Sequence, residues 1–243
     1  SSAVTFNFGQ DSSFVGNKPA QGYTDENGHG DFQYSVPSGY LACCTANLAD
    51  PGIDPAANDN PENHFNTVLY SGNGSTQSIT GVGHQPDWVW IKSRSNTYSH
   101  GLFDSVRGAT KKLYSDLTTA EATESGVTSF DSDGFSLGSA AGTNNSGSTY
   151  AAWNWLAGGS AVSNTDGDIT SSVSANTKAG FSIVSYSGNG NNGDPTVGHG
   201  LSQAPEFVIL RNRDATASWF VSHPDLSSEH YLYLQSSGGQ NNG

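Results

Sequence analysis

Three short acidic segments of the chain carry residue types that could bind a calcium ion. Each offers oxygen ligands at alternate positions around a glycine, as calcium loops do. The residues are Asp25, Asn27 and Asp31, then Asp131 and Asp133, and finally Asp166 and Asp168. None of the segments continues to the glutamate that an EF-hand carries at its twelfth position. Because Asp and Gly also form ordinary turns, we interpret all three as turns and expect no bound metal; Asp25, Asn27 and Asp31 stand as the calcium candidates.

The spacing of the residues does not point to a particular catalytic site. A glycosidase needs two carboxylates about 5–10 Å apart, but the chain has 22 acidic residues and the sequence favours no pair. His84 and His199 occupy matching places in a repeated turn region rather than beside a nucleophile, and we expect them to anchor that turn by hydrogen bonding. The sequence therefore predicts no enzyme and no cofactor, with glycan cleavage as an alternative.

The tryptophans include two pairs in which the members are two residues apart. These are Trp88 with Trp90 and Trp153 with Trp155. Residues two apart share one face of a strand, and aromatic faces on one side of a strand can stack on sugars. The first pair aligns with Phe207 and Ile209 further along the chain, a replacement that a core position accepts. We therefore interpret the tryptophan pairs as packing residues.

The residues that we expect to contact a ligand lie on two loops instead. Trp219 stands among polar residues in "SWFVSHPDL", which favours a surface position. Any glycan contact is expected on the loops around Asn189–Gly200 and Trp219–His223 rather than on Trp88 or Trp90. The candidate ligand-binding residues are Trp219, His223, Asn189, Asn191 and His199.

Two sites fit the pattern of an N-glycosylation acceptor. They are Asn73 in "NGS" and Asn144 in "NNS". A sequence so rich in Asn and Ser produces such matches by chance. They matter only if the chain passes through a glycosylating compartment.

The segments that would position these residues form a repeat, which occurs twice in the chain. "FNTVLYSGNG" begins at Phe65 and "FSIVSYSGNG" begins at Phe181, a shift of 181 − 65 = 116 positions. The match continues until Pro86 aligns with Pro205, so equivalent residues of the two copies are expected to superpose. Self-similarity over this length indicates tandem modules that each bury a core.

The amino-acid composition of each copy predicts where its strands lie. "TVLY" and "SIVSY" are β-branched and aromatic, and both run into "SGNG", which is typical of a tight hairpin turn. "DWVWIK" and "EFVILR" are apolar on both faces, as a central strand is. In the first copy, "GVTSFDSDGFSLG" and "STYAAWNWLAGG" predict further strands. The second copy lacks counterparts of these two segments, so we expect it to be truncated or to receive its last strands from another segment.

Few bases are available in this acidic chain. Nine Lys and Arg oppose 22 Asp and Glu, which leaves a net charge of −13. Such a charge repels a phosphate backbone, so no nucleic acid partner is expected, and no apolar run is long enough to insert into a membrane. Arg94 and Arg213 follow the strands "DWVWIK" and "EFVILR", and we expect both to pair with carboxylates at a module edge or a subunit interface, with solvated strand ends as the alternative.

Several strings resemble bacteriophage structural proteins. "FNFGQDSSF" and "GDFQYSVPSGYLACCTANL" are similar to the closing strands of SPRY-like (concanavalin-like) domains in such proteins. "YSGNGSTQSITGVGHQPDWVWIKSR" and the strings after it resemble a family of unknown chemistry in marine phage virion or tail-fibre proteins. "VGHGLSQAPEFVILRNR" followed by "SWFVSHPDL" also resembles segments of phage tail fibres. The resemblance implies a virion surface or fibre protein and brings no catalytic residues with it.

These observations predict an all-β chain of tandem antiparallel β-sandwich modules of the concanavalin-like or jelly-roll kind. The C-terminal strands of a SPRY-like sandwich are expected in residues 1–49, and a linker in 50–64. The first module is expected in 65–180 and a second, truncated module in 181–243.

The expected function is that of a structural component of a phage virion fibre or surface appendage, which adheres to host surface glycans. Its location would then be the virion surface or an extracellular appendage. Its partners would be other copies of itself, as a trimer in a tail fibre, and other virion proteins. A cellular surface-layer or adhesin filament subunit is the first alternative, and a glycan-cleaving enzyme the second.

Overall fold

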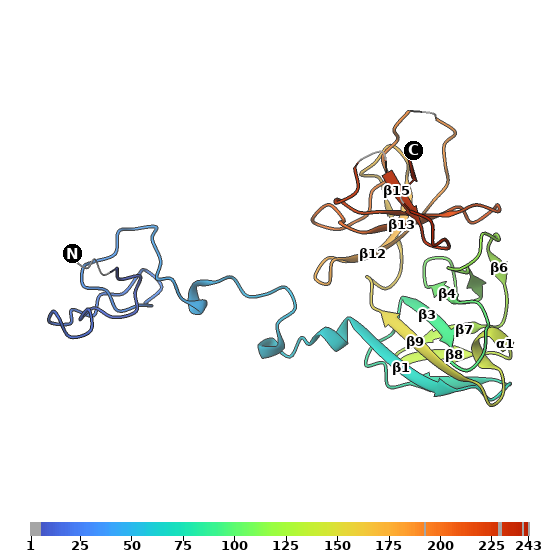
Figure 1. Cartoon of the computed structure of the whole chain (residues 1–243), viewed down its shortest axis with the longest axis horizontal. Coiled ribbons are helices and arrows are strands. Elements are labelled where there is room, and N and C mark those ends of the chain that lie inside the picture. Colours follow the sequence, from blue (N-terminus) through green and yellow to red (C-terminus); the bar gives the residue numbers. More distant parts are fainter. Residues whose placement is uncertain (1–5, 192, 228–229, 240, 243) are drawn as a thin grey trace. The chain divides into compact units, whose positions relative to one another are not determined.

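The computed structural model describes residues 6–191, 193–227, 230–239 and 241–242, and its regular structure is almost entirely β (Figure 1). The all-β prediction is therefore confirmed. The chain forms two compact units, Ser1–Pro51 and Gly52–Gly243, each of which is described by itself. Within the described residues, no helix has the length and apolar character needed to cross a membrane.

The unit Ser1–Pro51 contains little regular structure. Its described residues form the 3-10 helix η1 (Thr45–Asn47) and one isolated β-bridge between Tyr23 and Phe32. The short strands that the sequence predicts here are not formed. Side chains satisfy the backbone instead, and the Asp25 carboxylate alone accepts three backbone N–H bonds. Such bonds offer the backbone an alternative to a strand ladder.

The segment 50–64, predicted as a linker, contacts the strands that follow it through Asp59 and His64. His64 Nε2 lies 2.8 Å from the Asp59 carboxylate, and Lys178 forms an ion pair with the same carboxylate. Asn176 Nδ2 bonds His64 Nδ1 at 3.0 Å. The segment contains the 3-10 helices η2 (Pro55–Ala57) and η3 (Pro61–Asn63).

The first module (65–180) contains a two-layer β-sandwich (Figure 1). One layer is the antiparallel sheet β1-β9-β3-β4, and the other is β2-β8-β7. Val89, Ile91 and Phe103 from the first layer meet Phe135 and Leu137 from the second in the core. The strands are β1 (Phe65–Ser71), β9 (Thr149–Trp155), β3 (Trp88–Ser93), β4 (Gly101–Asp104), β2 (Gln77–Thr80), β8 (Gly134–Leu137) and β7 (Val127–Asp131). Beside them lie β5 (Lys111–Lys112), β6 (Ala122–Thr123) and the short helix α1 (Ala141–Asn144).

A fully buried asparagine closes one end of this sandwich. Asn144 Oδ1 accepts the backbone N–H of Asn73 and the side-chain N–H of Gln77, both at 2.9 Å, and its Nδ2 donates to the Gly138 carbonyl at 2.7 Å. The "SGNG" turn thus leads from β1 into the other layer, and β1 does not pair with β2. The predicted hairpin is therefore wrong, because the Asn144 amide satisfies the turn in place of a neighbouring strand.

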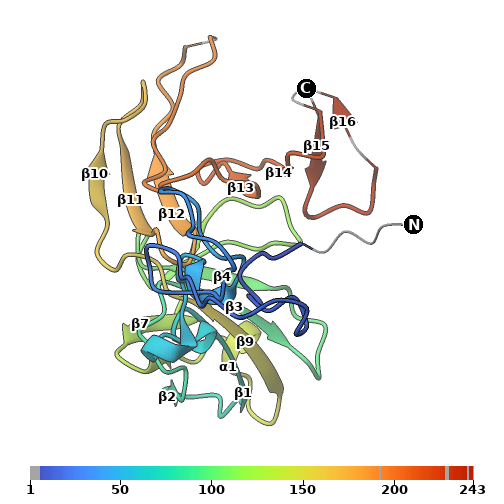
Figure 2. The same cartoon turned by 90° about the vertical axis from the view of Figure 1, so that its left-hand side faces the viewer.

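The second module (181–243) is divided between two sheets (Figure 2). Its first strand, β12 (Phe181–Tyr186), ends the sheet β10-β11-β12, and β13 (Val208–Arg211) begins the sheet β13-β14-β15-β16. The end of the first module, residues 158–180, supplies two strands of the former sheet, so that sheet crosses the module boundary. The remaining strands are β10 (Val162–Asn164), β11 (Ser171–Asn176), β14 (Trp219–Ser222), β15 (His230–Tyr233) and β16 (Asn241–Asn242).

The two predicted central strands differ in their surroundings. β3 is central, between β9 and β4, whereas β13 pairs only with β14 among the described residues. Val89 and Ile91 of β3 are 0% exposed, but their counterparts Val208 and Leu210 are 39% and 43% exposed. The prediction fails for β13 because the described part of the second module contains no layer that matches β2-β8-β7.

This difference predicts unequal effects of two equivalent truncations. Ile91→Ala should lower the free energy of unfolding by about 2–5 kcal/mol, because it leaves a cavity in a closed core. Leu210→Ala should lower it by about 1 kcal/mol, since its side chain is only partly buried. Denaturant unfolding of both variants measures the difference, and equal losses would contradict the open second module.

Candidate functional site

A cavity in the unit Gly52–Gly243 lies where the two modules meet. Its volume is about 430 Å³, and it is bordered by the outer face of β3, β4 and β9 and by residues of β12 and β13. The lining residues that the argument below uses are Trp88, Trp90, Trp155, Phe181, Arg211 and Arg213.

Aromatic rings cover the side of this cavity that belongs to the first module. Strand β3 alternates, so that Val89 and Ile91 enter the sandwich core while Trp88 and Trp90 stand on the outer face. The ring of Trp88 lies 4.6 Å from that of Trp155 and 5.7 Å from that of Phe181 on β12, centroid to centroid. The tryptophans therefore pack between the modules and also border the cavity.

Trp90 is fixed by a hydrogen bond to a histidine. Its Nε1 donates to His100 Nδ1 at 2.7 Å. Burial lowers the pKa of His100, which keeps the acceptor nitrogen unprotonated at neutral pH. The indole therefore holds one orientation against the cavity.

Two arginines share one glutamate beside the aromatic rings. Glu121 Oε2 accepts bonds from Arg107 Nη1 and Arg213 Nε, both at 2.9 Å, and Arg213 Nη2 donates to Oε1 at 3.1 Å. Arg107 also pairs with Asp104 at 2.5 Å. Because Arg213 comes from the second module and the other three from the first, this network joins the modules.

This network tests the prediction that Arg94 and Arg213 pair with carboxylates. Arg213 pairs with a carboxylate, as predicted. Arg94 is exposed and forms no ion pair within the described residues, so no pairing at a module edge is seen for it, and pairing at a subunit interface stays a prediction. Its backbone N–H instead pairs with Thr149 in the ladder.

Titration of Glu121 depends on both arginines. Burial alone would raise the pKa of Glu121, but the hydrogen bonds from Arg213 and then Arg107 outweigh it, and the pKa lies below its ordinary value. The bonds from Glu121 raise the pKa of Arg213 in turn. Glu121 and Arg213 are therefore both charged at neutral pH.

Not all N–H groups of the Arg211 guanidinium form hydrogen bonds within the described residues. Its Nη2 donates to the Thr119 carbonyl at 2.6 Å, and its guanidinium lies 5.6 Å from the ring centroid of Trp219. Its Nε and Nη1 are buried and have no partner among the described residues. Burial also lowers the pKa of this guanidinium. A bound group with oxygen acceptors would complete its hydrogen bonds.

The predicted ligand-binding residues are not brought together. Trp219 is 5% exposed, and its Nε1 donates to the Tyr114 carbonyl at 2.7 Å, so the expected surface position is wrong. Its large ring finds better partners in the Leu102 and Leu113 cluster than in water. His223 is exposed beside Asp225 at 3.6 Å.

The other predicted residues lie on the loop between β12 and β13. Asn189 and Asn191 are exposed, and each accepts a backbone N–H two residues further on; Asn192 lies outside the described residues. His199 Nδ1 accepts the Leu201 N–H at 3.1 Å and so anchors its turn as expected. Its counterpart His84 is buried, and burial lowers its pKa. Neither ring nitrogen of His84 has a hydrogen-bond partner among the described residues, so the expected anchoring is wrong for His84.

The calcium candidates are engaged in turns. Asp25 accepts the three backbone bonds noted above and a fourth from Asn47 Nδ2 at 2.7 Å. Burial opposes this, but the bonds dominate and lower the pKa of Asp25 to about 2. Asp31 accepts the Ser12 N–H at 3.1 Å, and Asn27 Nδ2 bonds Asn47. Across the part of the chain that the structure describes, no cluster of three or more His, Cys, Asp or Glu could hold a metal ion.

One serine has the spacing of a nucleophile elbow without its surroundings. Ser136 is the centre of "GFSLG", a pattern that requires a turn from a strand into a helix. Here it lies within β8, and its Oγ donates to the Asp131 carboxylate at 2.7 Å and faces Ser78 Oγ. No histidine bonds it among the described residues, so the pattern does not mark a triad.

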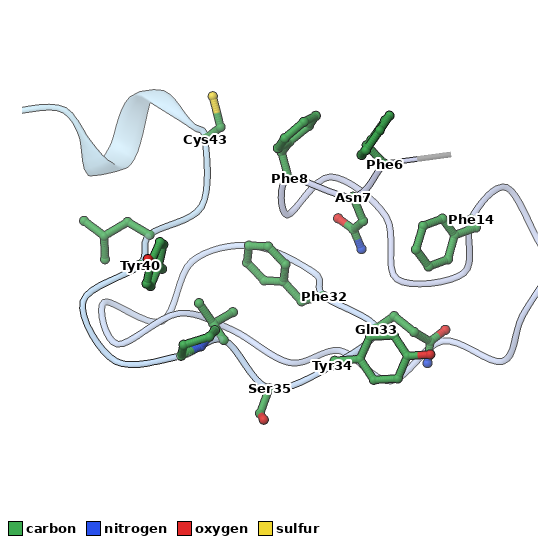
Figure 3. A pocket seen from close by; sticks show the side chains of 13 residues that line it. Phe6, Asn7, Phe8, Phe14, Phe32, Gln33, Tyr34, Ser35, Tyr40 and Cys43 are labelled. Carbon is green, nitrogen blue, oxygen red and sulfur yellow. The ribbon is translucent and has the colours of Figure 1, made fainter. Parts of the chain in front are cut away.

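A second hollow lies in the unit Ser1–Pro51 (Figure 3). Its volume is about 450 Å³. Aromatic side chains border it, and Phe6, Phe8, Tyr34 and Tyr40 are each more than 60% exposed. This small unit thus leaves much of its apolar surface uncovered.

Comparison with known proteins identifies the family of the larger unit. Residues 60–243 match the model described as Domain of unknown function (DUF7483). That range is more than half of the chain, which therefore belongs to this family. No curated protein and no solved structure matches the chain.

Sequence reasoning missed most of the cavity. Arg107 and Glu121 lie outside the repeated strings, and only the fold brings them to Arg213. One signal was available, because Arg211 and Arg213, which align with Lys92 and Arg94, are only two positions apart in a chain that has nine Lys and Arg.

The shared glutamate predicts a pH dependence of stability. Glu121→Gln should lower the free energy of unfolding at pH 7 by about 1–3 kcal/mol, because two partly buried guanidinium groups lose their charged partner. Since folding lowers the pKa of Glu121, its contribution is present above the ordinary value of 4.5 and is lost as the pH falls through the folded value. The variant should therefore lose less stability than the parent between pH 7 and pH 3. Glu206→Gln, at an exposed position, is the control and should change neither quantity.

Proposed function

We propose that the chain is a structural component of an extended surface appendage, of the kind that phage virions carry as fibres. The observation that carries this proposal is the open second module. Val208, Leu210 and Phe220 expose 37–43% of their surface, where the equivalents of the first two are fully buried in the first module. Exposed apolar strands of this kind are a site for pairing or packing with another chain.

Other features agree with this role. Repeated modules would lengthen a fibre, and the net charge of −13 would keep its surface soluble. The resemblance of the repeated strings to phage virion and tail-fibre proteins supports a location at the virion surface. The partners would then be other virion proteins and other copies of the chain, three in a tail fibre.

Immunogold electron microscopy tests the location. Antibodies raised against residues 52–243 should label fibres of purified particles, with pre-immune serum as the control. Residues 1–243 expressed alone should also self-associate in light scattering because of the exposed strands. Labelling of cellular filaments would instead favour an adhesin, and a well-folded monomer would contradict assembly through the chain itself.

Adhesion to glycans is a second candidate role, for the loop between β12 and β13. This loop is held at its base by the bridge between Ile169 and Val197 and by the Asp168 carboxylate, which accepts the Thr196 N–H at 2.9 Å. Its described tip presents the exposed amides of Asn189 and Asn191. Ordered amide groups on an exposed loop can form the hydrogen bonds that a sugar needs.

A glycan array separates the two roles. If the loop binds sugars, the double variant Asn189→Ala and Asn191→Ala should lose at least tenfold in signal, while Gln203→Ala, an exposed residue between His199 and β13, should keep it. The melting temperatures of all three proteins should agree. Binding lost through Trp88→Ala in a folded protein would move the sugar site to the cavity.

A further inference from the structure

Asparagine followed by glycine is a pair of residues that can change chemically without an enzyme. The backbone nitrogen of the glycine attacks the side-chain carbonyl carbon of the asparagine, ammonia leaves, and a cyclic succinimide remains. Water then opens the ring to aspartate or to isoaspartate, in which the backbone continues through the side-chain carbonyl carbon. Glycine favours this attack because it has no Cβ to hinder its nitrogen.

Five such pairs occur in the sequence. They are Asn27-Gly28, Asn73-Gly74, Asn189-Gly190, Asn192-Gly193 and Asn242-Gly243. The structure describes both residues of the first three pairs. The local structure around these three pairs can therefore be compared.

Two of the described pairs stand at equivalent places in the repeat, inside identical segments "YSGNG" that begin at Tyr70 and at Tyr186. Both asparagines are exposed, and the Oδ1 of each accepts a backbone N–H two residues further on, from Ser75 at 2.7 Å and from Asn191 at 3.0 Å. Negative charge develops on Oδ1 during the attack, and a donor that already points at this atom stabilises that charge. The two side chains are thus equally prepared, and the difference lies in the glycine nitrogen.

In the first copy, the glycine nitrogen is occupied. Gly74 N–H donates to the Asn144 carbonyl at 2.8 Å. The Asn144 side chain also holds Asn73, since its Oδ1 accepts the Asn73 N–H at 2.9 Å and its Nδ2 donates to the Asn73 Oδ1 at 3.2 Å. A Cβ on Gly72 would collide with the Asn145 carbonyl, so the turn has no room to move. A nitrogen held in this way cannot turn toward the asparagine side chain.

In the second copy, the glycine nitrogen is free. Gly190 N–H has no hydrogen-bond partner among the described residues, and a Cβ on Gly188 or Gly190 would meet no atom within 4 Å. The φ angles of Gly74 and Gly190 are 74° and 71°, so the backbones are alike and only the surroundings differ. The loop extends away from β12 into open space (Figure 2). The Gly190 nitrogen can therefore reach the side chain before it.

We infer that Asn189 is a site of spontaneous deamidation in the folded protein, whereas Asn73, in the same "YSGNG" segment, is protected by Asn144. Each event replaces an amide, which donates and accepts hydrogen bonds, with a carboxylate that only accepts them. It also adds one negative charge to a chain whose net charge is already −13. The surface of this loop therefore changes with the age of the molecule, whether or not the chain belongs to an appendage.

The pair Asn27-Gly28 provides an independent comparison in the other unit. Gly28 N–H donates to the Asp25 carbonyl at 3.0 Å, and Asn27 Nδ2 donates to Asn47 Oδ1 at 2.9 Å. Asn27 is exposed, yet its glycine nitrogen is occupied as in the first copy. Asn27 is therefore expected to react slowly, like Asn73, because exposure alone does not free the nucleophile.

Peptide mass spectrometry of aged protein measures the rate at each pair. Residues 1–243 are incubated in mildly alkaline buffer, and fragmentation of the peptides assigns the mass change to Asn189 separately from Asn192. Isoaspartyl methyltransferase labels the isoaspartate product. Asn189 should react at least tenfold faster than Asn73 and Asn27. Circular dichroism before and after incubation checks that the protein stays folded.

The same incubation in urea separates structure from sequence. Unfolding frees the Gly74 nitrogen, so Asn73 should react at least tenfold faster than in the folded protein and approach the rate of Asn189. The control Asn189→Gln should remove the reaction at this position and leave the rate at Asn73 unchanged, because glutamine forms the corresponding larger ring slowly.

Three results would overturn the inference. The first is equal rates at Asn73 and Asn189 in the folded protein, and the second is an Asn189 that stays intact there. The third is a difference of the same size in urea, because the flanking sequence and not the contacts of Asn144 would then cause it. None of these results bears on labelling of particles, so the proposed structural role stands or falls separately.

Discussion

The structure depends on a strand that is paired on both edges. β9 bonds β1 on one side and β3 on the other, and the sheet that it completes forms one wall of the sandwich core. This sheet and the facing layer β2-β8-β7 together seal Val89 and Ile91 from water. The described part of the second module has neither the paired central strand nor the facing layer, and the equivalent side chains are exposed.

The modules are joined by two different kinds of contact. Stacked rings of Trp88, Trp155 and Phe181 exclude water but allow small shifts, since apolar packing is not directional. Glu121 is directional, because its two oxygens take three bonds from two arginines of different modules. The rings hold the modules together while the glutamate selects their mutual orientation.

Much of the fold could be predicted from the sequence, and its failures have identifiable causes. "TVLY", "DWVWIK" and "STYAAWNW" form strands because composition and periodicity are local properties. The hairpin at "SGNG" failed because its partner, Asn144, is 71 residues away from Asn73. The central position of β13 failed because a strand's own residues do not say which neighbours it has. Trp219 was placed at the surface from its polar neighbours, although large rings are commonly drawn into a core. The cavity was missed because its charged residues meet only in the folded chain.

The buried amide of Asn144 has a consequence for how the protein can be made. Its Nδ2 carries no exposed surface and donates to carbonyl groups at the closed end of the sandwich. In a secretory eukaryotic host, oligosaccharyltransferase meets the nascent chain before this end closes and would modify that same nitrogen. A chain glycosylated at Asn144 could not bury this amide, so the product would divide into an unmodified fraction that folds and a glycosylated fraction that does not. Bacterial or cell-free synthesis avoids this competition.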